Sequence, residues 1–167
     1  MTTGAGDSAP VLTAPLAPRR TEAQVRRAVA AVYVVFIVNG FGFASWASRI
    51  PQVRDLLAVT PGTLGLVLLC AAVGSLIAMP LSSVVIARFG ERRTVTLFAL
   101  VYALGLATIA VGVLSGIGLV SLGIFLLGFG NGMWDVAMNV QGAAAEQALS
   151  RVIMSRFHAG FSIGTVL

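Results

Sequence analysis

The chain has 167 residues, of which 57% are hydrophobic and 10% are charged, and its mean hydropathy is +0.95. An ordinary soluble domain carries about 25% charged residues, so this composition indicates a membrane protein and excludes a typical soluble one. The net charge of +5 does not indicate nucleic-acid binding, because the arginines lie at the ends of apolar segments, where they act as topology signals.

Four apolar segments are long enough to cross a bilayer, for which about 20 residues are needed. The predicted spans are about 28–47, 64–87, 95–114 and 117–143, and a fifth begins near residue 157. We therefore predict an all-α polytopic membrane helix bundle over residues 28–167. Residues 1–27 are predicted to form a disordered cytoplasmic tail, because residues 1–18 are rich in Ala, Pro, Thr and Ser and lack periodicity.

The arginines indicate the orientation of these spans. Nine of the eleven belong on the side of the N-terminus: Arg19, Arg20, Arg26, Arg27, Arg88, Arg92, Arg93, Arg151 and Arg156. Only Arg49 and Arg54 follow the first span on the opposite side. Since cytoplasmic loops carry the excess of basic residues, we expect a multi-pass protein of the inner (plasma) membrane with a cytoplasmic N-terminus.

The first predicted span contains one polar amide, Asn39, beside Gly40 and Gly42. Glycines at this position would let the backbone loosen around a substrate, as in carriers with interrupted helices. The alternative is that Asn39 hydrogen-bonds a neighbouring helix, since both roles use the same chemistry.

The fourth predicted span contains Asp135, which is the only charged residue between Arg93 and Glu146. Burying a carboxylate in a bilayer costs roughly 2.5–3.5 kcal/mol, so such residues usually have a function. Small and polar residues share its helical face within about 40° of one direction: Gly128, Asn131, Asp135, Asn139 and Gly142. We expect this stripe to face the interior of a helix bundle.

Asp135 has a functional and a structural interpretation. A hydrogen bond to a neighbouring membrane helix contributes about 0.6 kcal/mol on average, which offsets little of the insertion cost. A carboxyl group that is neutral in one conformation and charged in another is what a proton-coupled carrier needs, and this interpretation is favoured. Asn131 and Asn139 are candidates for ligand contact or for bonds between helices.

His158 lies at the start of the fifth predicted span. The simpler interpretation is an interfacial residue near a helix N-terminus. The alternative is that it pairs with Asp135 or gates the cytoplasmic side. Trp46 and Trp134 are expected to be packing residues or interface anchors, and the Gly128–Gly132 pair is a GxxxG motif that favours helix packing.

One segment between the second and third spans, Arg88-Phe-Gly-Glu-Arg-Arg93, resembles the cytoplasmic signature of the major facilitator superfamily. The residues that fit are Arg88, Gly90, Arg92 and Arg93. Ser83 and Ala87 stand where the signature has a glycine and an aspartate, and the missing aspartate would pair with a neighbouring helix. A tight turn with a positive topology anchor is therefore the alternative to a gating role.

Further segments, residues 48–54, 130–139 and 156–164, resemble the fucose-permease-like branch and, still more, related uncharacterised bacterial inner-membrane permeases. The resemblance implies that Asp135 handles protons and sugar, and that Asn139 corresponds to an asparagine of that branch. The acidic residue of the first helix in that branch has only Asn39 as a counterpart here. Substrate identity does not follow from the resemblance.

Together these features predict the first four transmembrane helices, and the start of a fifth, of the N-terminal half of a carrier that needs its missing C-terminal half. The expected function is proton-coupled secondary transport of a small polar solute, such as a sugar or metabolite. The alternatives are a drug efflux carrier and a small non-transporting scaffold that uses the GxxxG motif. We expect no enzyme, cofactor, metal or nucleic-acid partner, because no nucleophile–base pair or metal-ligand cluster occurs.

Overall fold

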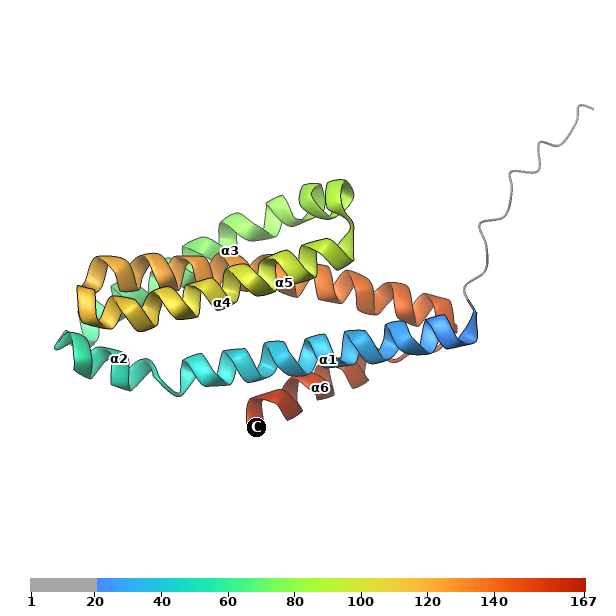
Figure 1. Ribbon diagram of the computed structural model, residues 1–167, viewed down its shortest axis with the longest axis horizontal. Coiled ribbons are helices and arrows are strands. Elements are labelled where there is room, and N and C mark those ends of the chain that lie inside the picture. The colour runs from blue at the N-terminus through green and yellow to red at the C-terminus, as the bar shows by residue number, and fades with distance from the viewer. Residues whose placement is uncertain (1–20) are drawn as a thin grey trace, which may run out of the picture.

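The computed structural model describes residues 21–167, which form α-helices and, within that range, no strand (Figure 1). The helices are α1 (Glu22–Ala47), α2 (Ile50–Leu57), α3 (Pro61–Phe89), α4 (Glu91–Ser115), α5 (Ile117–Leu149) and α6 (Met154–Val166). Four stretches are long and apolar enough to cross a membrane, namely α1 continued by α2, and α3, α4 and α5. The prediction of an all-α polytopic bundle is confirmed.

Helix α1 begins before the apolar segment does, so the prediction of a tail up to residue 27 is wrong for residues 22–27. Thr21 caps the helix: its side chain accepts a hydrogen bond from the Gln24 backbone N–H (3.3 Å), and the Gln24 side chain accepts one from the Thr21 N–H (2.9 Å). This reciprocal cap stabilises a polar first turn that hydropathy does not detect. The rest of the predicted tail, residues 1–20, lies outside the described residues.

Two other boundaries differ for similar reasons. Helix α6 begins at Met154, before the predicted residue 157, and α5 continues to Leu149, past the apolar run. Helix α2 was not predicted, because its eight residues are too few to cross a bilayer. Pro51 opens α2 and Val53 is buried, while Arg54 pairs with Asp55 at 2.8 Å on its exposed side.

Single glycines make the tight connections between α3, α4 and α5. Gly90 has φ +78° and Gly116 has φ +120°, values that side chains other than glycine rarely adopt. Each glycine ends one helix and begins the next, so α3, α4 and α5 run antiparallel in succession.

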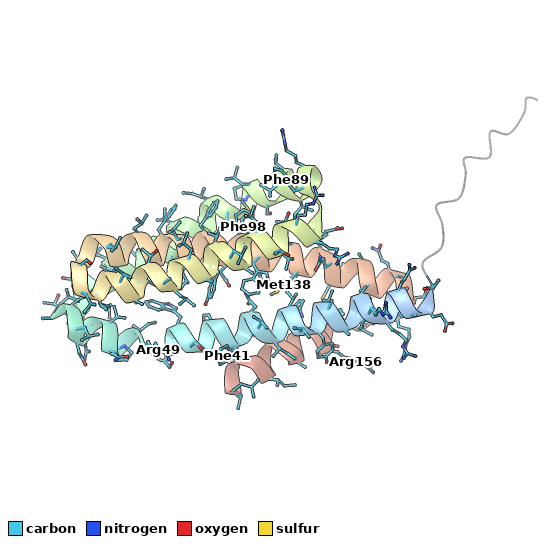
Figure 2. All side chains as sticks on the ribbon, viewed as in Figure 1. Phe41, Arg49, Phe89, Phe98, Met138 and Arg156 are labelled. Atoms are coloured by element: carbon cyan, nitrogen blue, oxygen red, sulfur yellow. The ribbon has the colours of Figure 1, made fainter. Side chains whose placement is uncertain are left out.

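Helix α5 lies at the centre of the bundle and contacts α3, α4, α1 and α6, whereas α6 packs mainly on α1 (Figure 1). Figure 2 shows the Phe98 side chain on α4 and Met138 on α5 within this packing, and both are buried. Helix α5 is therefore the described helix with the most neighbours, and Asn131, near its middle, bonds to α1.

The connections divide the arginines between the two ends of the bundle. The start of α1, the α3–α4 turn and the α5–α6 connection lie at one end, and α2 and the α4–α5 turn lie at the other (Figure 1). The first end therefore holds Arg26, Arg27, Arg88, Arg92, Arg93, Arg151 and Arg156. Arg49 and Arg54 lie at the second end. This separation is the charge asymmetry on which the predicted orientation depends.

Candidate functional site

Three polar residues, Asn131, Asp135 and Asn139, occupy successive turns near the middle of α5, and all are half-buried. Glycines on other sides of α5 make its close contacts with α3 and α4. A Cβ at Gly128 would collide with the Ala71 backbone on α3, and one at Gly130 would lie 2.7 Å from the Tyr102 nitrogen on α4. The polar residues therefore lie on the face of α5 directed toward α1 and α6.

Asn131 is bonded to the first helix. The Asn39 Nδ2 group donates a hydrogen bond of 3.1 Å to the Asn131 Oδ1, and Asn39 is only 2% exposed. Of the two interpretations of Asn39, the structure shows the bond between helices. With its oxygen occupied, Asn131 has its amide N–H groups free of partners within residues 21–167.

Asp135 and Asn139 are bonded to each other one turn apart. The Asn139 Nδ2 group donates to the Asp135 carboxylate Oδ1 (3.3 Å) and to the Asp135 backbone carbonyl (2.9 Å). Among the described residues the ion pair Arg54–Asp55 is the only one, so no cation there neutralises Asp135. One carboxylate oxygen of Asp135 and the Asn139 Oδ1 are thus left as acceptors.

His158 forms no ion pair with Asp135 in this conformation. It is exposed on α6, its Nδ1 is 3.1 Å from the Met154 carbonyl, and its ring centroid is 5.3 Å from that of Phe36. The contacts of His158 are therefore with α6 itself and with α1, and its pairing with Asp135 or a gating role stays a prediction.

The predicted stripe is divided between three neighbouring helices. At its ends, Gly128 packs on α3, and a Cβ at Gly142 would meet Met154 and Phe157 of α6 at 3.2 and 3.3 Å. The Ser75 hydroxyl on α3 donates to the Gly128 carbonyl at 2.9 Å. The three polar residues between these glycines are half-buried, and ligand contact stays a prediction for them.

The four residues of the superfamily-like loop gather at the α3–α4 turn. Gly90 makes the turn, and Arg88, Arg92 and Arg93 are exposed and form no ion pair within the described part of the chain. The Arg88 guanidinium lies 6.0 Å from the Phe89 ring centroid. The tight turn is confirmed, and the gating role of these residues stays a prediction.

Two residues around this site, Tyr102 and Glu146, were not predicted, and Trp134 was expected only to pack or to anchor the chain at the interface. The Tyr102 hydroxyl and the Trp134 indole N–H are buried without a hydrogen-bond partner within residues 21–167, and the two rings meet edge to face at 5.7 Å. The Glu146 carboxylate accepts hydrogen bonds from the Ile153 and Met154 N–H groups (2.8 and 2.7 Å) and so caps α6. A cap from the preceding helix has no short sequence signature, because it depends on how the chain turns.

Comparisons with known proteins identify the family and its relatives. Residues 14–167 match the family model described as Major Facilitator Superfamily. An uncharacterised MFS-type transporter of Yersinia pestis is 34% identical over 134 residues, which cover 80% of this chain and 34% of that protein. An uncharacterised transporter of Sinorhizobium fredii is 33% identical over 132 residues, covering 79% and 34%.

The membrane protein MosC of Rhizobium meliloti is 35% identical over 136 residues, covering 81% of this chain and 33% of that protein. The chain thus spans about a third of the length of the curated relatives it matches. No solved structure matches it.

Proposed function

Because this chain belongs to the Major Facilitator Superfamily, we propose that it forms part of a secondary active transporter that moves a small polar solute, such as a sugar or metabolite, with protons across the inner membrane. One observation carries the proposal: the Asp135 carboxylate lies near the middle of the central helix α5, between two amides and without a cation among the described residues. Carriers of this type bind their solute near the bilayer midplane.

The proposed proton coupling depends on the lack of a fixed partner for Asp135. A carboxylate locked in an ion pair would have to break that pair in each transport cycle. Among the described residues, the Asp135 carboxylate accepts a hydrogen bond only from Asn139. Ionisable groups inside membrane proteins often mark substrate or ion pathways and proton relays. His158, exposed on α6, is the candidate group for proton exchange with the cytoplasmic side, because an imidazole titrates in the physiological pH range.

The polar nature of the solute is supported by the hydrogen-bonding groups left free. Asn131 offers N–H donors, and Asp135 and Asn139 offer oxygen acceptors, at intervals of about 6 Å along the helix. A solute with several hydroxyl groups can both accept and donate along such a row. An apolar solute would leave these groups without partners at a cost of about 1–3 kcal/mol each.

A drug efflux carrier is the second candidate, and one feature favours it. A hollow of about 510 Å³ at the α2 end of the bundle is lined mainly by apolar side chains of α1, α2 and α4, including Phe41, Trp46 and Ile109. Its volume is in the range of sites for drug-sized ligands. The scaffold alternative has less support, because Gly128 and Gly132 pack against α3 and do not offer a free GxxxG face.

The proposal is tested with the full-length protein in vesicles that carry an imposed pH gradient. A panel of labelled sugars, polyols and apolar dyes identifies the solute class, and the Asp135→Asn variant is then compared with wild type. We expect Asp135→Asn to abolish accumulation against a gradient and to retain solute exchange, because the amide cannot cycle a proton.

Asp55→Asn is the matched control, because Asp55 is an exposed carboxylate on α2. Uphill uptake that persists in Asp135→Asn would remove Asp135 from the coupling role. Transport of the apolar dyes alone would favour the efflux carrier.

A further inference from the structure

The outer face of α4 is apolar and uncovered by the other described helices. Leu97, Leu100, Leu104 and Val111 expose 50, 63, 56 and 58% of their surfaces, and their spacing places them on one side of the helix. The opposite side packs on α5 through glycines such as Gly105. In a membrane, the exposed side of such a helix meets lipid chains.

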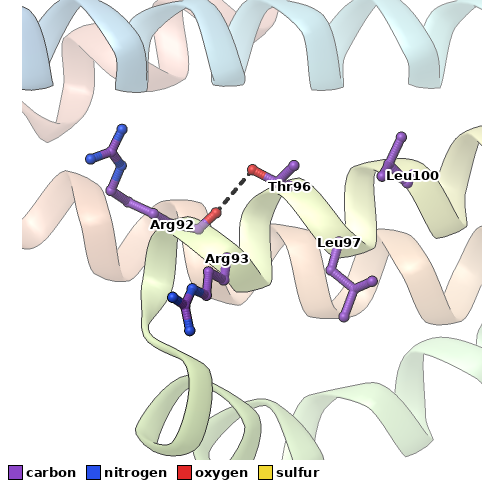
Figure 3. Close-up of a pocket in the computed structure, with 5 residues that line it drawn as sticks. All are labelled: Arg92, Arg93, Thr96, Leu97 and Leu100. Carbon is purple, nitrogen blue, oxygen red and sulfur yellow. Dashed lines mark hydrogen bonds between the residues drawn. The ribbon is translucent and has the colours of Figure 1, made fainter.

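Two arginines stand at the head of this face. Arg92 and Arg93 line a hollow of about 380 Å³ together with Thr96, Leu97 and Leu100. Figure 3 shows the two guanidinium groups reaching to either side of the α4 axis, with Thr96 and Leu100 following Arg92, and Leu97 following Arg93. The hollow therefore has a cationic entrance and an apolar continuation.

The polar side chains that line the hollow are the two cationic guanidinium groups and the Thr96 hydroxyl. The Thr96 hydroxyl donates to the Arg92 carbonyl at 3.0 Å, and neither arginine forms an ion pair with another described residue. Glu91 precedes them but does not line the hollow. Helix α4 has no side-chain cap at Gly90, so the positive end of its dipole adds to the same potential.

We propose that this hollow binds an anionic phospholipid, with its phosphate between Arg92 and Arg93 and an acyl chain along the leucine face. Guanidinium groups bind phosphate oxygens through paired hydrogen bonds, and basic pockets beside membrane helices bind anionic headgroups. From Leu97 to Val111 the helix rises about 21 Å, which exceeds the roughly 15 Å depth of one hydrocarbon leaflet. A free phosphate ion would use the arginines alone, whereas a phospholipid also covers the apolar face.

The test uses the full-length protein in mild detergent, with binding of phosphatidylglycerol and phosphatidylcholine measured by native mass spectrometry. We expect wild type to prefer phosphatidylglycerol about tenfold or more, and Arg92→Gln/Arg93→Gln to lose that preference. The control Arg49→Gln/Arg54→Gln removes the same charge at the other end of the bundle and should keep it. Leu100→Gln, which retains both arginines, should bind phosphatidylglycerol several-fold more weakly. Circular dichroism and size-exclusion profiles verify that each variant folds.

Three results would overturn the proposal. The first is an unchanged preference in Arg92→Gln/Arg93→Gln, which would place lipid binding elsewhere. The second is displacement of the lipid by millimolar inorganic phosphate, which would make this a site for the free ion. The third is wild-type affinity in Leu100→Gln, which would show that the apolar face takes no part. Each result is independent of whether Asp135 couples transport to protons.

Discussion

The hydrogen bonds of the polar residues indicate different roles for Asn39 on α1 and for the polar residues on α5. Asn39 is buried and its amide is bonded to Asn131, so its direct effect is on the position of α1 against α5. Asn131, Asp135 and Asn139 are half-buried and keep free donors or acceptors. Under the proposed function we therefore expect solute contacts from the α5 residues, and Asn39 holds one of them in place.

Tyr102 allows a prediction about stability at the residue scale. Its hydroxyl is buried without a partner in the described part of the chain, and a group in that state costs about 1–3 kcal/mol. Tyr102→Phe should therefore leave the free energy of unfolding unchanged or raise it by up to about 1 kcal/mol. Thermal unfolding of the full-length protein in detergent measures this change.

The control is Tyr102→Ala, which removes the ring that packs on Trp134 and should destabilise the protein by about 3–5 kcal/mol. A clear loss of stability in Tyr102→Phe would show that the hydroxyl has a hydrogen-bond partner in the membrane-embedded protein.

At the scale of helices, glycines determine how closely α5 approaches its neighbours. Gly128 and Gly132 face α3, and Gly123 and Gly130 face α4, where a Cβ would meet backbone atoms at 2.7 Å. Membrane helices associate through such close contacts because the hydrophobic effect does not draw them together in lipid. These glycines of α5 thus pack against α3 and α4 of the same chain.

Gly128→Ala tests this packing. The new methyl group would collide with the Ala71 backbone, which cannot move aside as a flexible side chain can, so we expect a loss of about 1–3 kcal/mol in stability. Gly65→Ala is the matched control, because nothing lies within 4 Å of its added Cβ. That variant should be neutral or gain about 0.5–1 kcal/mol from better helix propensity.

Both variants are compared by thermal unfolding and by chemical crosslinking of the purified protein. Equal stability of Gly128→Ala and Gly65→Ala would mean that α3 and α5 are farther apart in the membrane. Loss of a crosslinked dimer in Gly128→Ala would restore the scaffold interpretation.

At the scale of the whole molecule, the separation of arginines predicts the orientation in the membrane. The end that holds the α3–α4 turn carries seven of the nine described arginines, and the α2 end carries Arg49 and Arg54. Since the more basic end stays in the cytoplasm, the start of α1 should be inside and α2 outside.

Cysteine labelling in intact cells measures this orientation. In a Cys70→Ala background, the exposed residues Gln24 and Gln52 are replaced one at a time by cysteine. We expect a membrane-impermeant maleimide to label Gln52→Cys at once and Gln24→Cys only after the cells are permeabilised. The reverse pattern would contradict the charge rule for this protein.

The sequence alone determined the number of spans, the fold class and the division of charge, because the apolar length and the charge at helix ends are properties of neighbouring residues. The sequence also identified Asp135 as a carboxylate within a predicted span, because a charged residue in an apolar run is recognisable without a structure. The sequence did not predict where α1 and α6 begin, because a polar first turn carries no hydropathy signal.

Only the tertiary structure decided which groups meet. Asn39 and Asn131 are 92 residues apart in the chain, and their bond follows from the packing of α1 against α5. The GxxxG motif does not specify which helix packs on it, and the structure shows that α3 packs on Gly128 and Gly132. A helical pattern specifies which residues share a face, but the neighbour of that face depends on how all the helices pack together.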